Sequence, residues 1–137
     1  MTQPALKDFT PVDGITVAEG GQVRVPLADG LTVGSVTYTA AVLRQLNAGA
    51  VLAAAEAAER LVSTATGLEL VSSPARMGAE LLRRQVLRLE DDNGGKFDGP
   101  LELAQLHDLS ARDLESLNTA VRLLDTAAEK SMAGITG

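Results

Sequence analysis

Residues 22–39 are QVRVPLADGLTVGSVTYT, and this stretch decides the fold expected for the first part of the chain. Apolar and polar residues alternate on either side of Ala28-Asp29-Gly30. The alternating apolar residues are Val23, Val25, Leu27, Val33 and Tyr38. Two alternating runs around a glycine-containing break predict a β-hairpin that turns at 28–30. Pro26 has no amide hydrogen, so the first strand is expected to be an edge or irregular there.

From Asn47 onward the apolar period changes from two to about 3.6, which is typical of helices. An alanine-rich helix is expected at about 48–62, capped by Asn47 and followed by a connector at 63–73. A second helix is expected at about 74–90, a short one within 101–109, and a last one from Ser110. The predicted fold class is therefore α+β and mostly α-helical: an N-terminal β-hairpin, three main helices and a short helix.

The length of 137 residues suits one domain. Residues 1–21 contain prolines and glycines without a sustained period, which predicts a flexible lead-in, with a short strand at Ile15 and Val17 as an option. The single domain is expected at 22–130, and residues 131–137 are expected to be a flexible tail.

The core must be aliphatic, because the chain has no Trp, one Tyr and two Phe. Much of its hydrophobic content is alanine, which buries little area per residue. A small core of this kind gives limited stability to a monomer, and self-association would bury more apolar surface. The composition therefore favours a homo-oligomer.

Charge and composition exclude several classes of protein. The net charge of −6 argues against binding to nucleic acid or to an anionic membrane surface. The chain has no cysteine, so disulfides, thiolate metal sites and cysteine nucleophiles are absent. A signal peptide and an apolar stretch of membrane-spanning length are not found in the sequence. A cytoplasmic protein is expected.

Chemical motifs are weak, and no enzyme, cofactor or metal site is predicted. His107 is the only histidine and lacks a partner carboxylate at a suitable spacing. The loop at 91–102 resembles a calcium loop, but Lys96 stands where the turn glycine is needed and Gly95 where a ligand is needed. The Gly20-Gly21 and Gly94-Gly95 pairs do not form phosphate loops.

The residues expected to bind a partner lie on the two helices that follow the hairpin. The alanine-rich helix has a small apolar surface that suits close contact with another protein. Arg83, Arg84 and Arg88 form a basic strip that is either a solvated helix face or a site for an acidic segment. The predicted partner-binding residues are Val51, Ala54, Ala55, Ala58, Arg84 and Arg88.

The last helix carries a stripe that steps by three and four residues. The stripe consists of Leu114, Leu117, Val121, Leu124 and Ala128. It lasts only two heptads, which is short for a coiled coil that holds a long partner by itself. A place in the core is favoured over a partner groove, with Leu117 and Leu124 as the central core residues.

Three segments together resemble the tail assembly chaperones of Mu-like phages: VTYTAAVLRQLNAG at 36–49, LLRRQ at 81–85 and LSARDL at 109–114. The resemblance covers about residues 22–128. Leu46 and Ala50 depart from the proline and aspartate that the family commonly has there. The resemblance implies a non-structural helper in the cytoplasm of the bacterial host, which binds the phage tape-measure protein and keeps it soluble during tail assembly.

Two other classes remain open from the residues alone. One is a structural tail or head-completion subunit that stays in the virion. The other is a helical cytoplasmic adaptor or antitoxin-like binding protein. Either would have the same lack of catalytic groups and the same amphipathic helices.

Overall fold

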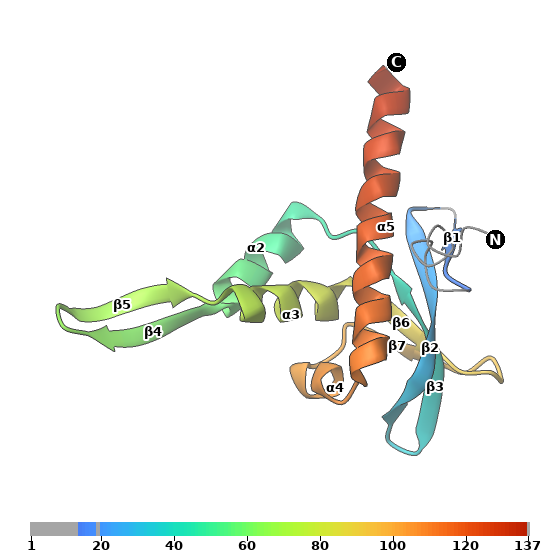
Figure 1. Cartoon of the computed structure of the whole chain (residues 1–137), viewed down its shortest axis with the longest axis horizontal. Coiled ribbons are helices and arrows are strands. Elements are labelled where there is room, and N and C mark those ends of the chain that lie inside the picture. Colours follow the sequence, from blue (N-terminus) through green and yellow to red (C-terminus); the bar gives the residue numbers. More distant parts are fainter. Residues whose placement is uncertain (1–13, 19, 137) are drawn as a thin grey trace, which may run out of the picture.

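The computed structural model describes residues 14–18 and 20–136, except for the side chains of Ala18 and of residues 127–136. A five-stranded antiparallel sheet with the order β1-β2-β3-β6-β7 forms the body of the molecule (Figure 1). Its strands are β1 (Thr16–Ala18), β2 (Gln22–Val33), β3 (Val36–Leu43), β6 (Val86–Glu90) and β7 (Lys96–Asp98). β1 lies within the expected lead-in of 1–21, whose residues 1–13 are outside the described residues.

The described helices are α2 (Ala48–Ala57), α3 (Pro74–Gln85), α4 (Leu103–His107) and α5 (Ala111–Thr136). α5 packs against β2, and its C-terminal part extends beyond the sheet (Figure 1). The helix continues through most of the expected tail at 131–137, as far as Thr136.

A second, separate sheet is a two-stranded ribbon of β4 (Glu59–Thr64) and β5 (Gly67–Ser72). It extends away from the rest of the molecule, at the left of Figure 1. The prediction of a mostly helical domain is therefore wrong, since seven strands form in the described residues where one hairpin was expected.

The core lies between the sheet and α5. It contains buried aliphatic residues from β2, β3, β6 and all helices but α2, together with Tyr38, whose ring centroid is 6.0 Å from that of Phe97. Leu117 and Leu124 of the α5 stripe are each 1% exposed, which confirms their predicted place in the core. Leu114 is 37% exposed and lies at the edge of the same stripe.

The predicted turn at 28–30 is wrong, because β2 continues through it and the chain turns at Gly34-Ser35. The pairs Pro26–Ala40 and Leu31–Tyr38 leave residues 27–30 of β2 opposite Thr39 alone. Four residues opposite one make an enlarged β-bulge, which bends the strand and leaves the extra residues unpaired in the ladder. Gly30 has a φ of +79°, and a Cβ there would lie 3.0 Å from the carbonyl oxygen of Tyr38. The irregularity expected near Pro26 is confirmed.

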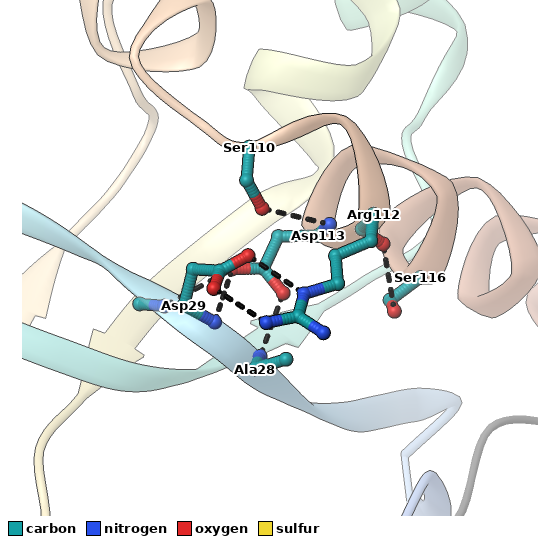
Figure 2. A network of polar contacts seen from close by, with 7 residues as sticks. Ala28, Asp29, Ser110, Arg112, Asp113 and Ser116 are labelled. Atoms are coloured by element: carbon teal, nitrogen blue, oxygen red, sulfur yellow. Dashed lines mark hydrogen bonds and ion pairs between the residues drawn. The ribbon is translucent and has the colours of Figure 1, made fainter.

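The bulge binds the first turn of α5 (Figure 2). Asp113 is fully buried, and its two carboxylate oxygens accept hydrogen bonds from the amides of Ala28 at 2.6 Å, Asp29 at 2.9 Å and Gly30 at 3.0 Å. Arg112 donates to both carboxylate oxygens of Asp29, at 2.7 and 2.9 Å. We call Arg112 and Asp113, together with Asp29 and the backbone of 28–30, the α5–β2 clamp.

The clamp explains why a buried carboxylate is tolerated. An ionised carboxylate in the core is costly unless its oxygens are hydrogen-bonded. The three amides supply these bonds, and Asp113 also sits in the first turn of α5, where the helix dipole favours negative charge. Its own amide donates to Ser110 Oγ at 3.2 Å, so Ser110 caps the start of the helix.

The predicted second helix at 74–90 ends five residues early, at Gln85. Val86 to Glu90 instead form β6, which pairs with β3 and buries Val86 and Leu89. These two residues continue the helical three-and-four spacing from Leu82, so the apolar pattern alone did not distinguish the strand. Pairing with the central strand of the sheet outweighs helix propensity here.

The helix predicted at 48–62 begins where expected but is too long, and the predicted connector at 63–73 is wrong. The helix ends at Ala57, and residues 59–72 form the β4–β5 ribbon with a two-residue turn at 65–66. Gly67, at a φ of +124°, does not end a helix but begins β5 directly after the turn.

Two carboxylates are held between pairs of arginines. Glu80 is 3% exposed and accepts hydrogen bonds from Arg83 Nε at 2.9 Å and from Arg84 Nη1. Glu90 bridges Arg24 of β2 and Arg88 of β6 across β3, at 2.9 Å each. Burial opposes ionisation of Glu80, but both arginines outweigh it, so the pKa of Glu80 lies below its ordinary value. Hydrogen bonds from Arg88 and Arg24 likewise lower the pKa of Glu90.

The clamp predicts that Asp113→Asn strongly lowers the free energy of unfolding. The asparagine side chain has one acceptor oxygen in place of two, so it cannot accept from all three backbone N–H groups of 28–30. Its NH₂ group would also face one or more of these donors. We expect a loss of about 2–3 kcal/mol in the free energy of unfolding, measured by urea denaturation. Asp125→Asn removes the same charge from an exposed site on the same helix and should change stability by less than about 0.5 kcal/mol. Equal stability of the two variants would contradict the clamp.

The core stripe predicts that Leu117→Ala and Leu124→Ala each cost about 2–5 kcal/mol, because each leaves a cavity in a packed core. Leu114→Ala, at the exposed edge of the same helix, should cost under about 1 kcal/mol. Thermal or urea unfolding of the three variants checks this order, and a larger loss from Leu114→Ala would reverse the assignment of inside and outside.

The two arginine-held glutamates predict a loss of stability in acid. Their folded pKa values are lowered, so they stabilise the fold above the ordinary glutamate pKa of about 4.3 and cease to do so as pH falls through the folded values. As the pH falls below about 4.3, protonation of these two glutamates should therefore lower the urea concentration at the unfolding midpoint. Glu80→Gln should flatten that drop, while Glu56→Gln, at an exposed site on α2, should leave it unchanged.

Candidate interaction surface

The alanine-rich helix α2 is shorter than expected and packs against α3. Asn47 caps it as predicted, with Oδ1 accepting from the amide of Ala50 at 2.8 Å. Ala54 and Ala58, two of the predicted partner-binding residues, are fully buried. Their small side chains let other parts of this chain approach closely, so they are not available to a partner while the chain is folded. A larger side chain at Ala54 would disturb that packing.

The other predicted residues of α2 are more accessible. Val51 is 39% exposed and Ala55 is half-buried. Leu52, which was not predicted, is 64% exposed. α2 thus presents two large apolar side chains in sequence: Leu52 is the more exposed, and Val51 lines a shallow cavity together with Leu81 of α3 and Val121 of α5.

The predicted basic strip is neutralised within the chain. Arg83 and Arg84 both bind Glu80, and Arg83 Nη1 also donates to the carbonyl oxygen of Leu101 at 3.0 Å. Arg88 binds Glu90. Arg84 and Arg88 are thus paired within their own elements, α3 and β6, and an acidic partner would have to compete with these ion pairs.

The β4–β5 ribbon carries an apolar surface that was missed from the sequence. Its register pairs Leu61 with Leu70 and Ser63 with Leu68, so three leucines lie on one face. We call this the leucine face: Leu61 is 64% exposed, and Leu68 and Leu70 are each 68% exposed. The opposite face carries Val62 and Val71 beside Arg60 and Glu69.

Exposed apolar residues gather in one continuous segment of the chain. Seven of the ten large hydrophobic residues that are exposed in the described part lie within 51–71. They are Val51, Leu52, Leu61, Val62, Leu68, Leu70 and Val71. A concentration of this kind marks a protein–protein contact more often than a free surface.

A signal for the ribbon does exist in the sequence. Residues 61–71 are LVSTATGLELV, with β-branched residues on both sides of a glycine-containing turn. In β2, burial of one face gives the alternation of apolar and polar residues from which the strand was predicted. Both faces of the ribbon are exposed, so burial does not impose this alternation there.

A groove lies beside the base of the ribbon, between α3, α4 and α5, with a volume of about 490 Å³. Ala75, Gly78 and Ala79 of α3 form a low wall, because their side chains are short. The remaining lining residues are Pro74, Leu82, Leu106, His107, Leu109, Leu114 and Asn118. The groove is mainly apolar, and the exposed His107 stands at it without a carboxylate among the lining residues.

In the loop that resembles a calcium loop, the Asp91 carboxylate accepts hydrogen bonds from backbone amides. Asp91 Oδ1 accepts from the amides of Asn93 at 2.9 Å and Gly95 at 2.6 Å, which closes the turn between β6 and β7. Within the described residues, no three metal-ligating side chains gather at one place. None of the described helices has both the length and the apolar character needed to cross a membrane.

Comparison with known proteins places this chain in a family. The model of the tail assembly protein gp41 family matches residues 27–135. The chain is 39% identical over 120 residues to the probable tail assembly protein gp41 of Escherichia phage Mu, covering 85% of this chain and 80% of that protein. No solved structure matches the chain.

Two further relatives agree with this result. The probable tail assembly protein FS-gp41 of phage Mu has the same identity over 120 residues, but the chain spans only 61% of its length. The Mu-like prophage FluMu protein gp41 of Haemophilus influenzae is 36% identical over 106 residues, covering 77% of this chain and 80% of that protein. The chain belongs to the family of Mu-like phage tail assembly proteins.

Proposed function

We propose that this protein is a tail assembly chaperone that binds the tape-measure protein of its phage and keeps it soluble until the tail tube is built. It would act in the cytoplasm of the bacterial host and be absent from the finished particle. The single observation that supports the proposal most is the exposed apolar segment at 51–71, in a chain whose family is named for tail assembly.

The physical argument begins with the partner. A long helical protein that awaits assembly exposes apolar stripes, and such stripes aggregate in water unless another surface covers them. A chaperone therefore needs accessible apolar side chains of its own. Val51 and Leu52 on α2, followed by the ribbon, supply these in a continuous stretch.

The rest of the molecule suits a soluble carrier. The core residues lie away from this segment, between the sheet and α5, so partner binding does not require the fold to open. The net charge of −6 keeps the carrier and its complex dispersed through mutual repulsion. Bound apolar segments would thus gain cover without loss of solubility.

Release also follows from this arrangement. The exposed segment is small, and a contact of limited area between two amphipathic surfaces can be replaced by a larger one. Polymerising tube subunits would compete for the same apolar stripes and displace the chaperone.

Co-expression with the tape-measure protein of the same phage tests the proposal. The chain should copurify with the tape-measure protein and raise its soluble fraction. Val51→Gln combined with Leu52→Gln should reduce both several-fold, because it removes apolar contact from α2 while glutamine preserves helix propensity. Ala53→Gln, at an exposed position between them and Ala54, should behave as the unchanged chain does.

Two outcomes would contradict the proposal. One is a tape-measure protein whose solubility does not depend on this chain. The other is recovery of the chain, by mass spectrometry of purified virions, in the amount expected of a tail subunit. The second outcome would support a structural role in the particle.

A further inference from the structure

The leucine face of the ribbon has no cover within the described residues. Its three leucines are all about two-thirds exposed, and the ribbon is held to the molecule only through α2 and α3 at its base. A two-stranded hairpin is at best marginally stable in water unless it packs against another element. The ribbon therefore needs a surface to pack against.

The same chain presents an apolar groove that no side chain of the described residues fills. The groove between α3, α4 and α5 has a volume of about 490 Å³. Removal of a leucine side chain from a protein core leaves a cavity on the order of 150 Å³, so three leucines require about 450 Å³. The leucine face and the groove match in apolar character and in size.

The ribbon cannot occupy the groove of its own molecule. Only Ser73 separates β5 from α3, and the ribbon and α3 point in opposite directions from that residue along nearly one line (Figure 1). The leucine face would have to fold back through half a turn over a one-residue link. A second molecule is needed to bring the two surfaces together.

We propose that the leucine face of each ribbon docks in the α3–α4–α5 groove of a second copy of this chain, forming a two-fold dimer with two identical contacts. The strands have six residues each, or ~20 Å, and α3 has twelve, or ~18 Å. Because ribbon and helix are collinear and equally long, an antiparallel pair of molecules sets each ribbon beside the other copy's α3. The contact is self-complementary, as a two-fold interface must be.

The dimer covers the leucine face but leaves the other apolar residues of the proposed chaperone surface available. Val51 and Leu52 lie on α2, and Val62 and Val71 lie on the opposite face of the ribbon. The inference does not depend on the proposed function, since association of the chain with itself is measured without any other phage protein.

The experiment uses the full chain and two variants that damage opposite halves of the contact. Leu68→Thr with Leu70→Thr removes two of the three leucines of the leucine face and retains strand propensity. Gly78→Gln places a long polar side chain in the groove. A Cβ at Gly78 has no atom within 4 Å, and glutamine is a better helix former than glycine, so this variant should fold at least as well.

Sedimentation equilibrium measures association of each protein and of their mixture. The unchanged chain should be a dimer at micromolar concentration, and each variant alone should dimerise at least about tenfold more weakly. The mixture should associate more tightly than either variant alone, because the intact ribbon of the Gly78→Gln chain fits the intact groove of the other. Val36→Thr and Arg76→Gln, exposed changes outside the contact, should dimerise normally.

Several results would overturn the inference. They are a monomeric unchanged chain, self-association that neither variant weakens, and a mixture that recovers nothing although circular dichroism shows both variants folded. Capture of the ribbon by the tape-measure protein in an otherwise monomeric chain would assign the leucine face to that partner instead.

Discussion

The buried carboxylate of Asp113 joins the longest helix to the sheet, and the arrangement of the other elements depends on that bond. Three consecutive amides of β2 turn out of the ladder to meet it, which requires the bulge at 27–30 and a glycine at position 30. With the first turn of α5 fixed at this point, Leu117 and Leu124 come to lie over the sheet. At the other side of the body, Glu90 joins β6 to Arg24 of β2, and Arg83 of α3, which is paired with Glu80, donates to the carbonyl oxygen of Leu101.

Sequence patterns predicted the elements whose burial is one-sided. Period two along β2 and β3 indicated the hairpin, and the three-and-four spacing indicated α5 and its core leucines. β6 was missed because Val86 and Leu89 fit the apolar spacing of a helix. Only the pairing with β3 makes this segment a strand. The ribbon was missed because its two exposed faces impose no simple alternation. Ala54 and Ala58 were assigned to a partner surface because a small side chain suits contact with any helix, and the nearest one, α3, belongs to the same chain.

The molecule thus separates into a body with a clamped core and a segment at 51–71 that exposes its apolar residues. The family shows that the chain is a tail assembly protein. The chaperone role and the two-fold dimer are proposals that use different parts of this segment. The partner would contact α2 and the ribbon face that carries Val62 and Val71, and the second copy would contact the leucine face. A body that stays closed while its projecting segment binds other proteins can hold an aggregation-prone partner and release it without unfolding.

The central claim is that the segment at 51–71 gains its cover from other protein molecules and not from its own chain. Hydrogen exchange of the backbone amides, followed by mass spectrometry at falling protein concentration, tests this most directly. Amides of 59–72 should exchange far faster than those of β2 and β3 in dilute solution and become protected at high concentration or with bound tape-measure protein, because an uncovered two-stranded ribbon opens easily. Protection of the ribbon equal to that of the central sheet in a dilute monomer would contradict the account.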